Sequence, residues 1–374
     1  MIDNKLKISI ALSGGGIRAS LFHLGVLKYL ADKDFLEKVT MISSVSGGSL
    51  LIGLIYSLND NNWPSSEQFL NTVFPKSKII ITSIGLQEKA LKSLLINPIS
   101  LFLGKAKLIS KCLEKYWGIN GRLDQIPKSP RWTINSTTYE TGKNWRFIPQ
   151  KRMGDYKTNY VLDPKLKISN AISASAGYPG LIGPLTIYPN KFKWVSFKDI
   201  NRIIKPTFKK IHLWDGGLYD NLGIESIFKS GKQVLRDETN FLIVSDASLG
   251  IEFQNRPFDF FRRSLRLIDI VMDQVRSLKA RSVINFFQAN LNSGVYLQIG
   301  NTAKYILQQA KYPITDIKKL ENTTLNFANV RKAAEHKTDL NKVTIEQFDL
   351  LTRHGYEVAK YTCKGYISRD VIDN

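Results

Sequence analysis

Two short apolar runs near the start of the chain, residues 7–12 and 39–43, each end in a turn rich in small residues. Apolar residues then recur at helical spacing after each turn, over residues 17–31 and from Gly47 to about Leu58. Gly25, inside the first of these helices, is a place where another backbone could pack closely. The order strand, helix, strand, helix predicts a parallel sheet with right-handed crossovers.

Further along the chain, alternating and continuous apolar segments extend this pattern. Strands are expected at residues 132–137, 145–148, 209–214 and 241–245, and a short helix at residues 165–176. The first two strands are separated by a short connection containing a glycine, which predicts a hairpin. The last is almost unbroken apolar sequence, which is typical of a strand buried on both faces.

Residues 69–119 have a different character, because apolar positions alternate with lysines around Pro98 without a clean strand period. This pattern resembles a helical cap inserted into the sheet domain, over about residues 64–125. Two interpretations of its apolar face remain open. The face could close over the protein's own core, as most amphipathic helices do, or it could lie on an anionic membrane.

The last third of the chain is expected to be helical. A long helix is predicted from Phe258 to Phe287, with apolar residues at three- and four-residue spacings and arginines between them. We interpret its apolar stripe (Leu265, Ile268, Met272, Val275 and Leu278) as core, and its basic face, which includes Arg276, as solvated. With no repeat and no linker, the chain is expected to form one elaborated domain: residues 1–250 catalytic, and residues 251–374 a helical extension packed on it.

Charge adds an expectation about partners. The 374 residues include 53 Lys and Arg against 32 Asp and Glu, a net charge of +21, which favours attraction to nucleic acid, anionic lipid or a phosphorylated metabolite. The basic residues are scattered rather than gathered in one run, so no nucleic acid is expected as a partner. A merely solvated basic surface is the alternative.

Cysteine usage and hydropathy indicate in which compartment the protein is found. Cys112 and Cys363 lie far apart in the chain and have no partner at metal spacing, which indicates neither a disulfide framework nor a zinc site and fits a cytoplasmic protein. No signal-like apolar stretch precedes the first strand. The longest apolar runs are far shorter than the roughly 20 residues that span a bilayer, so any membrane contact is expected to be peripheral.

The two small-residue turns carry candidate chemistry. Gly14, Gly15 and Gly16 would aim bare N–H groups at an anion, at a helix N-terminus with partial positive charge. Ser46 would sit on a sharp strand-to-helix turn, as in nucleophilic hydrolases, where it needs a base and oxyanion donors. The G-x-S-x-G pattern lacks its first glycine, since residue 44 is serine. Taken alone, the turn could be an ordinary Ser/Gly-rich loop.

A third predicted strand ends at a carboxylate that could act together with the two turns. Asp215 ends the predicted strand at residues 209–214, and the two glycines after it would free it to approach Ser46. Because sites collect at the carboxyl ends of parallel strands, three loops are expected to converge there. Asp220 and Asp246 are competing carboxylates. His23 is interpreted as a packed or hydrogen-bonded histidine rather than a catalytic one.

In these motifs the chain resembles the patatin-like phospholipases, a family of serine acyl hydrolases with a Ser–Asp dyad. The segments that carry the resemblance are Gly14–Arg18, Ser44–Gly48, Ala171–Ala176 with Pro179, and Asp215–Gly217 with Asp220 and Asn221. They extend over roughly residues 8 to 247. The resemblance implies a three-layer α/β fold, with a mainly parallel central sheet flanked by helices, a helical cap and a helical C-terminal extension.

The resemblance also implies a reaction. Ser46 Oγ would attack a fatty-acyl ester of a membrane phospholipid, and Asp215 would act as the base for both acylation and deacylation. N–H groups at Gly14, Gly15 and Gly16 would form the oxyanion hole. Arg18 would orient that loop or meet a lipid phosphate. Asp215 is preferred to Asp246 because the segment that begins with Asp215 matches the family. Asp220 is taken as structural. No metal or cofactor is expected.

Three alternatives stay open. An α/β-hydrolase triad would pair Ser46 with an acid and with His336 or His354, although that fold usually places several strands before the nucleophile. The Gly14–Ala19 segment also fits the weak G-x-G-x-x-G/A fingerprint of a dinucleotide-binding module. Finally, the same fold could serve a regulated membrane-damaging effector in bacterial defence or secretion, with the basic cap and the helical tail acting as a switch.

Overall fold

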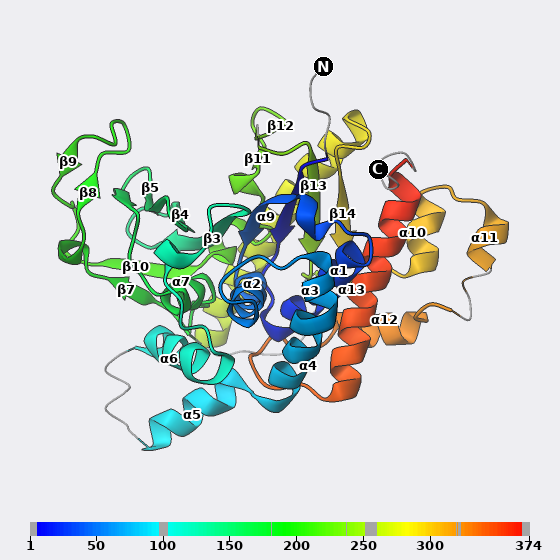
Figure 1. Ribbon diagram of the computed structural model, residues 1–374, viewed down its shortest axis with the longest axis horizontal. Coiled ribbons are helices and arrows are strands. Elements are labelled where there is room, and N and C mark those ends of the chain that lie inside the picture. The colour runs from blue at the N-terminus through cyan, green and yellow to red at the C-terminus, as the bar shows by residue number, and fades with distance from the viewer. Residues whose placement is uncertain are drawn as a thin grey trace.

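The computed structural model describes residues 6–96, 104–180, 182–236, 238–250, 260–318, 320 and 323–368. Its centre is a 12-stranded sheet with helices on both faces (Figure 1). The central part is parallel: β1 (Ile8–Leu12) lies between β13 (Phe241–Asp246) and β2 (Val39–Ser44) and runs parallel to both. Outside these lie β14 (Gly294–Gln298) and β3 (Arg131–Thr138), again parallel to their neighbours. The expected parallel central sheet is confirmed.

Beyond β3 the sheet turns antiparallel. The successive neighbours are β4 (Asn144–Ile148), β5 (Arg152–Asp155), β6 (Asn159–Leu162), β8 (Trp194–Val195) and β9 (Ile203–Ile204). The predicted hairpin is the pair β3 and β4. Short connections join β3 to β6, and such connections force antiparallel pairing because a parallel crossover needs a dozen residues or more.

One further strand enters the sheet from the opposite direction. β10 (Ile211–Asp215) pairs antiparallel with the last residues of β3 and with β7 (Leu185–Ile187). β2 ends with Ser44 opposite Ile134 of β3, and β10 ends with Asp215 opposite Ser136. The carboxyl ends of β2 and β10 therefore meet head-on beside β3. This differs from the expectation that all three site loops leave parallel strands.

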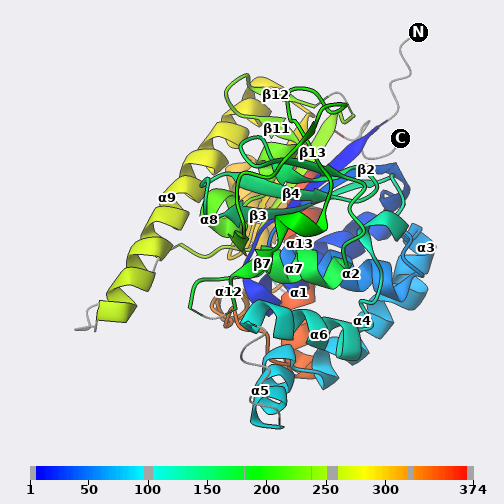
Figure 2. The same ribbon diagram turned by 90° about the vertical axis from the view of Figure 1, so that its left-hand side faces the viewer.

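Two helical layers cover the sheet (Figure 2). One face carries α1 (Gly16–Ala31), α2 (Gly47–Leu58), α7 (Ile168–Ser175) and α13 (Ile345–Tyr366), which share the larger apolar core. The other face carries α9 (Phe260–Ala289), whose Val283 and Phe286 pack with Leu242 and Val244 of β13 in a smaller core. Strand β13 is buried throughout, as its sequence predicted. The three-layer α/β arrangement is confirmed.

The segment expected to form a cap consists of helices. They are α3 (Ser66–Gln68), a π-helical turn at Phe69–Val73, α4 (Phe74–Ser83), α5 (Leu86–Ile96) and α6 (Lys105–Trp117). Residues 97–103, which include Pro98, lie outside the described residues. Apolar side chains point both ways, since Ile81 and Leu108 are buried whereas Ile79, Leu91 and Leu95 are exposed.

The remaining elements are short. Single-turn helices lie at Leu36–Lys38, Leu123–Gln125, Pro189–Lys191, Gly217–Asp220 (α8) and Ile224–Ser226, and a two-stranded ribbon is formed by β11 (Phe228–Lys229) and β12 (Val234–Leu235). The C-terminal part adds α10 (Ala303–Gln309), α11 (Ile314–Lys318) and α12 (Phe327–Ala334). None of the described helices is both long and apolar enough to cross a membrane.

Two expectations about the C-terminal part are wrong. The apolar stripe of α9 is not core: Leu278 is 60% exposed and the other four members are only half-buried. Arg276, expected on a solvated face, is instead buried against the sheet. The extension also contains β14, which the sequence did not predict. The expected first residue of the long helix, Phe258, lies outside the described residues.

Helices α1 and α13 approach so closely that glycines are required at their contact. A Cβ added to Gly25 would lie 1.9 Å from the carbonyl oxygen of Thr352, and one added to Gly355 would lie 1.9 Å from that of Phe22. Both obstacles are backbone atoms, which cannot move aside alone. The close approach expected at Gly25 is therefore present, and it joins the first helix of the chain to the last.

We predict that Gly25→Ala destabilises the protein although alanine is the better helix former. Alanine gains about 1 kcal/mol of helix propensity, but overpacking against a backbone carbonyl costs about 1–3 kcal/mol or more. Chemical denaturation should show a lower unfolding midpoint than the wild type. Gly231→Ala is the matched control, since a Cβ there meets no heavy atom within 4 Å. Equal midpoints for Gly25→Ala and wild type would contradict the prediction.

Candidate active site

Ser46 occupies the turn between β2 and α2 in a backbone conformation that few residues adopt. It is the N-cap of α2, with φ 48° and ψ −113°. A positive φ is uncommon outside glycine and marks a turn held by its surroundings. The glycines that follow are required by space: a Cβ on Gly47 would lie 2.2 Å from the Gly16 carbonyl oxygen, and one on Gly48 would lie 2.8 Å from that of Leu12. The turn has the shape that a nucleophile elbow needs.

Ser44, which replaces the first glycine of the elbow pattern, has room for its side chain. Its Oγ lies 2.9 Å from Ser49 Oγ and accepts a 2.9 Å hydrogen bond from Trp132 Nε1. The residue is fully buried at the end of β2. A serine at this position therefore contributes to the packing of the turn instead of obstructing it.

Ser175, the last residue of α7, hydrogen-bonds to the backbone of Ser46 and to that of Gly216, the residue after Asp215. Its Oγ accepts from Ser46 N (3.0 Å), and its carbonyl oxygen accepts from Gly216 N (3.2 Å). Ser49 Oγ lies 2.9 Å from the same Oγ. The sequence indicated this helix but not the serine. The only signal was its place at the helix end, directly before the Gly-Tyr-Pro-Gly stop.

Asp215 lies beside Ser46 at the head-on meeting of β10 and β2. Its carboxylate accepts from Gly217 N (2.7 Å) and lines the same cavity as Ser46. Burial raises the pKa of Asp215 to about 7, and hydrogen bonding by the Gly217 N–H and the Ser46 side chain opposes part of that rise. A carboxylate with such a pKa can take up and release a proton near neutral pH, which an ordinary aspartate does poorly.

The glycine loop offers N–H groups from two of its three glycines. The Gly14 N–H donates to the Asn221 carbonyl oxygen (3.1 Å), so it is committed to the protein. Gly15 (φ 134°) and Gly16 (φ 56°) line the same cavity as Ser46, and their N–H groups have no acceptor in the part of the chain that the structure describes. Of the three N–H groups expected to form an oxyanion hole, that of Gly14 is already paired, and those of Gly15 and Gly16 remain as candidates.

The glycine loop is also covered from outside by the segment before α13. A Cβ on Gly16 would lie 2.0 Å from the Thr338 carbonyl oxygen, and the Ile17 N–H donates to Asp339 O (2.9 Å). A bound pyrophosphate would need this N–H at the helix N-terminus. The contact therefore does not favour the dinucleotide-binding alternative.

Arg18 is directed away from solvent and holds the glycine loop. Its guanidinium donates to the carbonyl oxygens of Ala334 (2.8 Å), His336 (3.3 Å) and Ala247 (3.1 Å), and its side chain is buried. Burial lowers the pKa of Arg18. Of the two roles expected for it, orienting the loop agrees with these contacts. Contact with a lipid phosphate does not, because the guanidinium is already enclosed by carbonyl oxygens.

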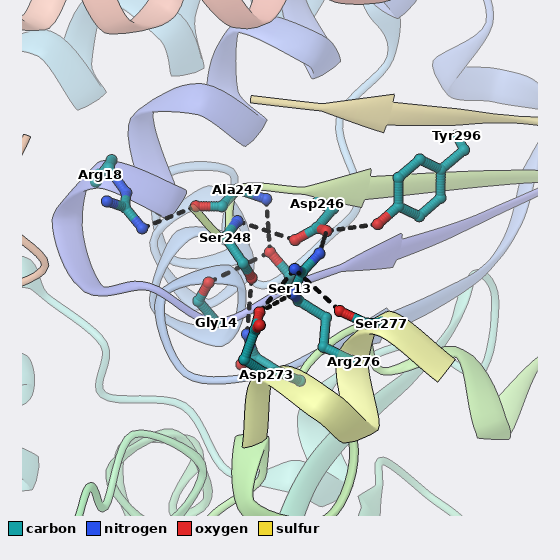
Figure 3. Close-up of polar contacts among 11 residues, drawn as sticks. Ser13, Gly14, Arg18, Asp246, Ala247, Ser248, Asp273, Arg276, Ser277 and Tyr296 are labelled. Atoms are coloured by element: carbon teal, nitrogen blue, oxygen red, sulfur yellow. Dashed lines mark hydrogen bonds and ion pairs between the residues drawn. The ribbon is translucent and has the colours of Figure 1, made fainter. Parts of the chain in front are cut away.

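Asp246, the main competitor of Asp215, is committed to other partners. Figure 3 shows its carboxylate between Arg276 and Tyr296. Its Oδ2 accepts from Arg276 Nη1 (2.9 Å) and Tyr296 OH (2.5 Å), and Oδ1 accepts from Ser248 N (2.9 Å). Asp246 does not line the cavity that contains Ser46. Asp246 is therefore a structural residue that anchors α9 and β14 to the sheet.

Asp220 is likewise placed for a structural role. It is buried, and its Oδ2 accepts from Glu225 N (3.0 Å) and lies 3.5 Å from Lys279 Nζ. It does not line the cavity that contains Ser46.

The histidines do not complete a triad with Ser46. His23 is fully buried; its Nε2 donates to the Ser13 carbonyl oxygen (3.0 Å), so its Nδ1 accepts from Ser245 Oγ (2.7 Å). Burial lowers the pKa of His23 to about 4, and the ring stays neutral. This is the packed histidine that the sequence indicated. His354 Nε2 accepts from Gly300 N (2.9 Å), and burial lowers its pKa to about 3.

Ser46 and Asp215 open into a cavity of about 830 Å³. Its walls come from α5, α6, α9 and the segment 337–340, so the cap and the C-terminal part both contribute. About half of the lining side chains other than Ser46 and Asp215 are apolar, among them Leu91, Leu108, Ile109, Ile182, Met272 and Leu340. No histidine is among the described residues that line it. The cavity thus places apolar side chains together with the Ser46 hydroxyl, the Asp215 carboxylate and the glycine loop.

Comparison with known proteins agrees with this geometry. The family model of patatin-like phospholipases matches residues 10–228, more than half of the chain. Curated relatives include a patatin-like phospholipase domain-containing protein of Chaetomium globosum, 24% identical over 65% of this chain and 24% of its own length, and Lysophospholipase 3 of Saccharomyces cerevisiae, 35% identical over 19% and 11%. The chain spans about a quarter of the length of the curated relatives that match 65% of it.

The architecture also matches a solved structure. Human GIVD cytosolic phospholipase A2 superposes with a TM-score of 0.58 at 13% sequence identity, over 97% of this chain and 62% of that one. At this identity the match concerns the fold alone, and it includes the C-terminal part beyond the region that the family model covers. The chain belongs to the patatin-like phospholipase family.

Proposed function

We propose that the protein is a lipid acyl hydrolase that cleaves fatty-acyl esters of membrane phospholipids through Ser46 and Asp215. One observation carries the proposal: Ser46 and the buried carboxylate of Asp215 line the same large cavity, together with Gly15, Gly16 and a set of apolar side chains. A water-soluble small substrate would not need such a lining. An acyl chain does, because burial of its methylenes contributes about 0.8 kcal/mol each.

The first half of the proposed reaction forms an acyl-enzyme. Asp215 accepts the Ser46 hydroxyl proton as Oγ attacks the ester carbonyl carbon, and the carbonyl oxygen becomes an oxyanion. The N–H groups of Gly15 and Gly16 donate to that oxyanion, which they stabilise more than the neutral carbonyl. Asp215 then gives its proton to the departing alcohol, the lysophospholipid. The bond from Ser46 Oγ to the acyl carbon replaces the ester bond that breaks.

The second half returns the enzyme to its starting state. Asp215, now ionised again, accepts a proton from a water molecule that attacks the acyl carbon. The tetrahedral intermediate collapses as the proton passes to Ser46 Oγ, and the fatty acid leaves. One carboxylate thus serves as base and acid in turn, which requires a pKa near the working pH. The raised pKa of Asp215 meets that requirement.

The exposed apolar residues of the cap support a membrane surface as the place of reaction. Leu95 is 82% exposed, Leu91 and Ile79 are each more than half exposed, and lysines lie between them in α4 and α5. Leu91 also lines the cavity of Ser46. Apolar side chains set among cations are suited to entering an anionic lipid surface peripherally. Such an orientation would bring an acyl chain to the cavity directly from the bilayer.

We expect Ser46→Ala and Asp215→Asn each to lower kcat for phospholipid hydrolysis by roughly four to six orders of magnitude, as the loss of a nucleophile or its base does in other hydrolases. Mass spectrometry of a phospholipid mixture after incubation would measure the released fatty acids and lysophospholipids. His336→Ala is the control and should retain activity. Wild type and Ser46→Ala with the same product profile would refute the proposed function.

We expect activity to fall with acidification through the pKa of Asp215. The base must be ionised, so kcat/KM should be level above about pH 7 and should drop about tenfold per pH unit below it. A profile that stays level to the pKa of an ordinary aspartate would exclude Asp215 as the base.

The raised pKa of Asp215 also predicts how the stability of the protein depends on pH. The folded-state pKa of Asp215 is raised above its unfolded value. Between about pH 4 and pH 7 the folded protein therefore binds one more proton than the unfolded protein, and it loses stability as the pH rises through that window. Asp215→Asn removes the ionising group. The Tm of this variant should therefore exceed that of the wild type at about pH 8 and approach it at low pH.

We expect Leu95→Asp to impair hydrolysis at membranes but not hydrolysis itself. Loss of one leucine from a lipid contact costs about 1.5–3 kcal/mol, which corresponds to a fall of about tenfold or more in activity on phosphatidylcholine and phosphatidylglycerol vesicles. Hydrolysis of a monomeric short-chain ester should be unchanged. Leu291→Asp is the matched control, because Leu291 is 81% exposed outside the cap. Equal vesicle activities of the two variants would contradict a cap-mediated contact.

A further inference from the structure

A second cavity, separate from that of Ser46, is lined mainly by cationic side chains. It has a volume of about 260 Å³, and the cations around it are Arg131, Arg146, Lys151, Arg152, Lys229 and Arg236. Glu238 is the one carboxylate among the described residues that line it. We call it the basic cavity. Its residues come from β3, β4, β5, β11 and the loop after β12, which are far apart in the sequence.

The basic cavity lies at the opposite edge of the sheet from the catalytic cavity. Arg131 begins β3 and pairs with Met41 in β2, whereas Ser46 follows the other end of β2. Figures 1 and 2 agree, since the β11–β12 ribbon and the cap helices α5 and α6 lie at opposite ends of the molecule. A ligand in the basic cavity would therefore not touch the reacting groups.

The cations of this cavity are short of negative partners. Arg131 pairs with Glu238, and Arg146 lies 3.8 Å from Glu225, which is itself held by Lys279 at 2.9 Å. Burial lowers the pKa values of Arg131 and Arg146, and the charge of Arg236 lowers both further. Burial also lowers the pKa of Lys151, and the charges of Arg131 and Arg152 lower it further. Mutual repulsion of this kind is relieved when an anion binds among the cations.

Ser226, which lines the cavity, carries a buried hydroxyl without a partner among the described residues. Ser226 is 4% exposed, and its Oγ has no hydrogen-bond partner in the described part of the chain. Arg131 Nε is likewise buried without a partner there. Buried polar groups of native proteins almost always have partners, so each exception needs a reason. An anion bound in the cavity that draws either side chain toward itself would supply the missing acceptor.

We propose that the basic cavity is a binding site for a phosphate-bearing anion, supplied either as a free phosphorylated small molecule or as the phosphomonoester headgroup of a lipid. Guanidinium groups match phosphate oxygens in a bidentate geometry, and arginine predominates here. The volume equals roughly nine water molecules at about 30 Å³ each, which admits a phosphate group and its near neighbours. It is too small and too concave for a nucleic-acid duplex.

The test measures binding of two probes to the whole protein. Inorganic pyrophosphate, followed by calorimetry, represents the free source. Phosphatidylcholine vesicles with phosphatidic acid, compared by flotation with vesicles that hold phosphatidylglycerol at equal charge, represent the lipid source, because the cap attracts both compositions alike. Ser46→Ala should bind each probe as the wild type does, because the site is separate from Ser46 and Asp215. Binding of one probe or of both supports the site and identifies its source; binding of neither overturns the proposal.

Two variants localise the binding. Ser226→Ala removes a hydroxyl that makes no hydrogen bond in the described structure, so Tm without probe should be unchanged while affinity falls about tenfold. Lys151→Ala with Lys229→Ala removes two exposed lining cations and should lower affinity roughly tenfold at low salt. Lys33→Ala with Lys193→Ala makes the same charge change at exposed lysines outside the cavity and should leave affinity near wild type. Equal losses in the two double variants would overturn the proposal.

Discussion

The register of β3 is the constraint on which the active site depends. Strand β2 runs parallel to its first half and β10 antiparallel to its second half, so two chain segments about 170 residues apart end facing each other beside it. Ser46 and Asp215 meet because of this pairing. A shift of one residue in either strand would turn its side chains to the opposite face of the sheet. The approach of Ser46 to Asp215 therefore needs a well-packed sheet, and the large core on the α1 and α13 side provides it.

The site contains groups that cost stability and are held by their surroundings. Ser46 has a positive φ and Asp215 is buried as an ionisable group. Ser175 hydrogen-bonds to the backbone of both segments, and Arg18 ties the glycine loop to three carbonyl oxygens. Two of those carbonyls belong to the C-terminal part, residues 334 and 336. The C-terminal part is thus connected to the glycine loop itself.

Charge divides the molecule into two ends with different chemistry. The cap end combines exposed leucines with lysines above an apolar cavity, which suits a lipid surface. The other end gathers arginines around a small cavity with unsatisfied donors, which suits a compact anion. The net charge of +21 is therefore only partly a solvated surface. Scattered positions in the sequence become a cluster because strands from distant segments are neighbours in the sheet.

The sequence by itself determined the local elements of the site. Apolar runs broken by glycine and serine predicted β1, β2, α1 and α2, and the motifs at Ser46 and Asp215 predicted the family. Only the tertiary structure decided how they meet: that β10 is antiparallel, that Gly14 gives its N–H to Asn221, and that Arg276 is buried against Asp246. These outcomes depend on pairing and burial between distant segments, and local propensity carries no information about which partners a residue will find.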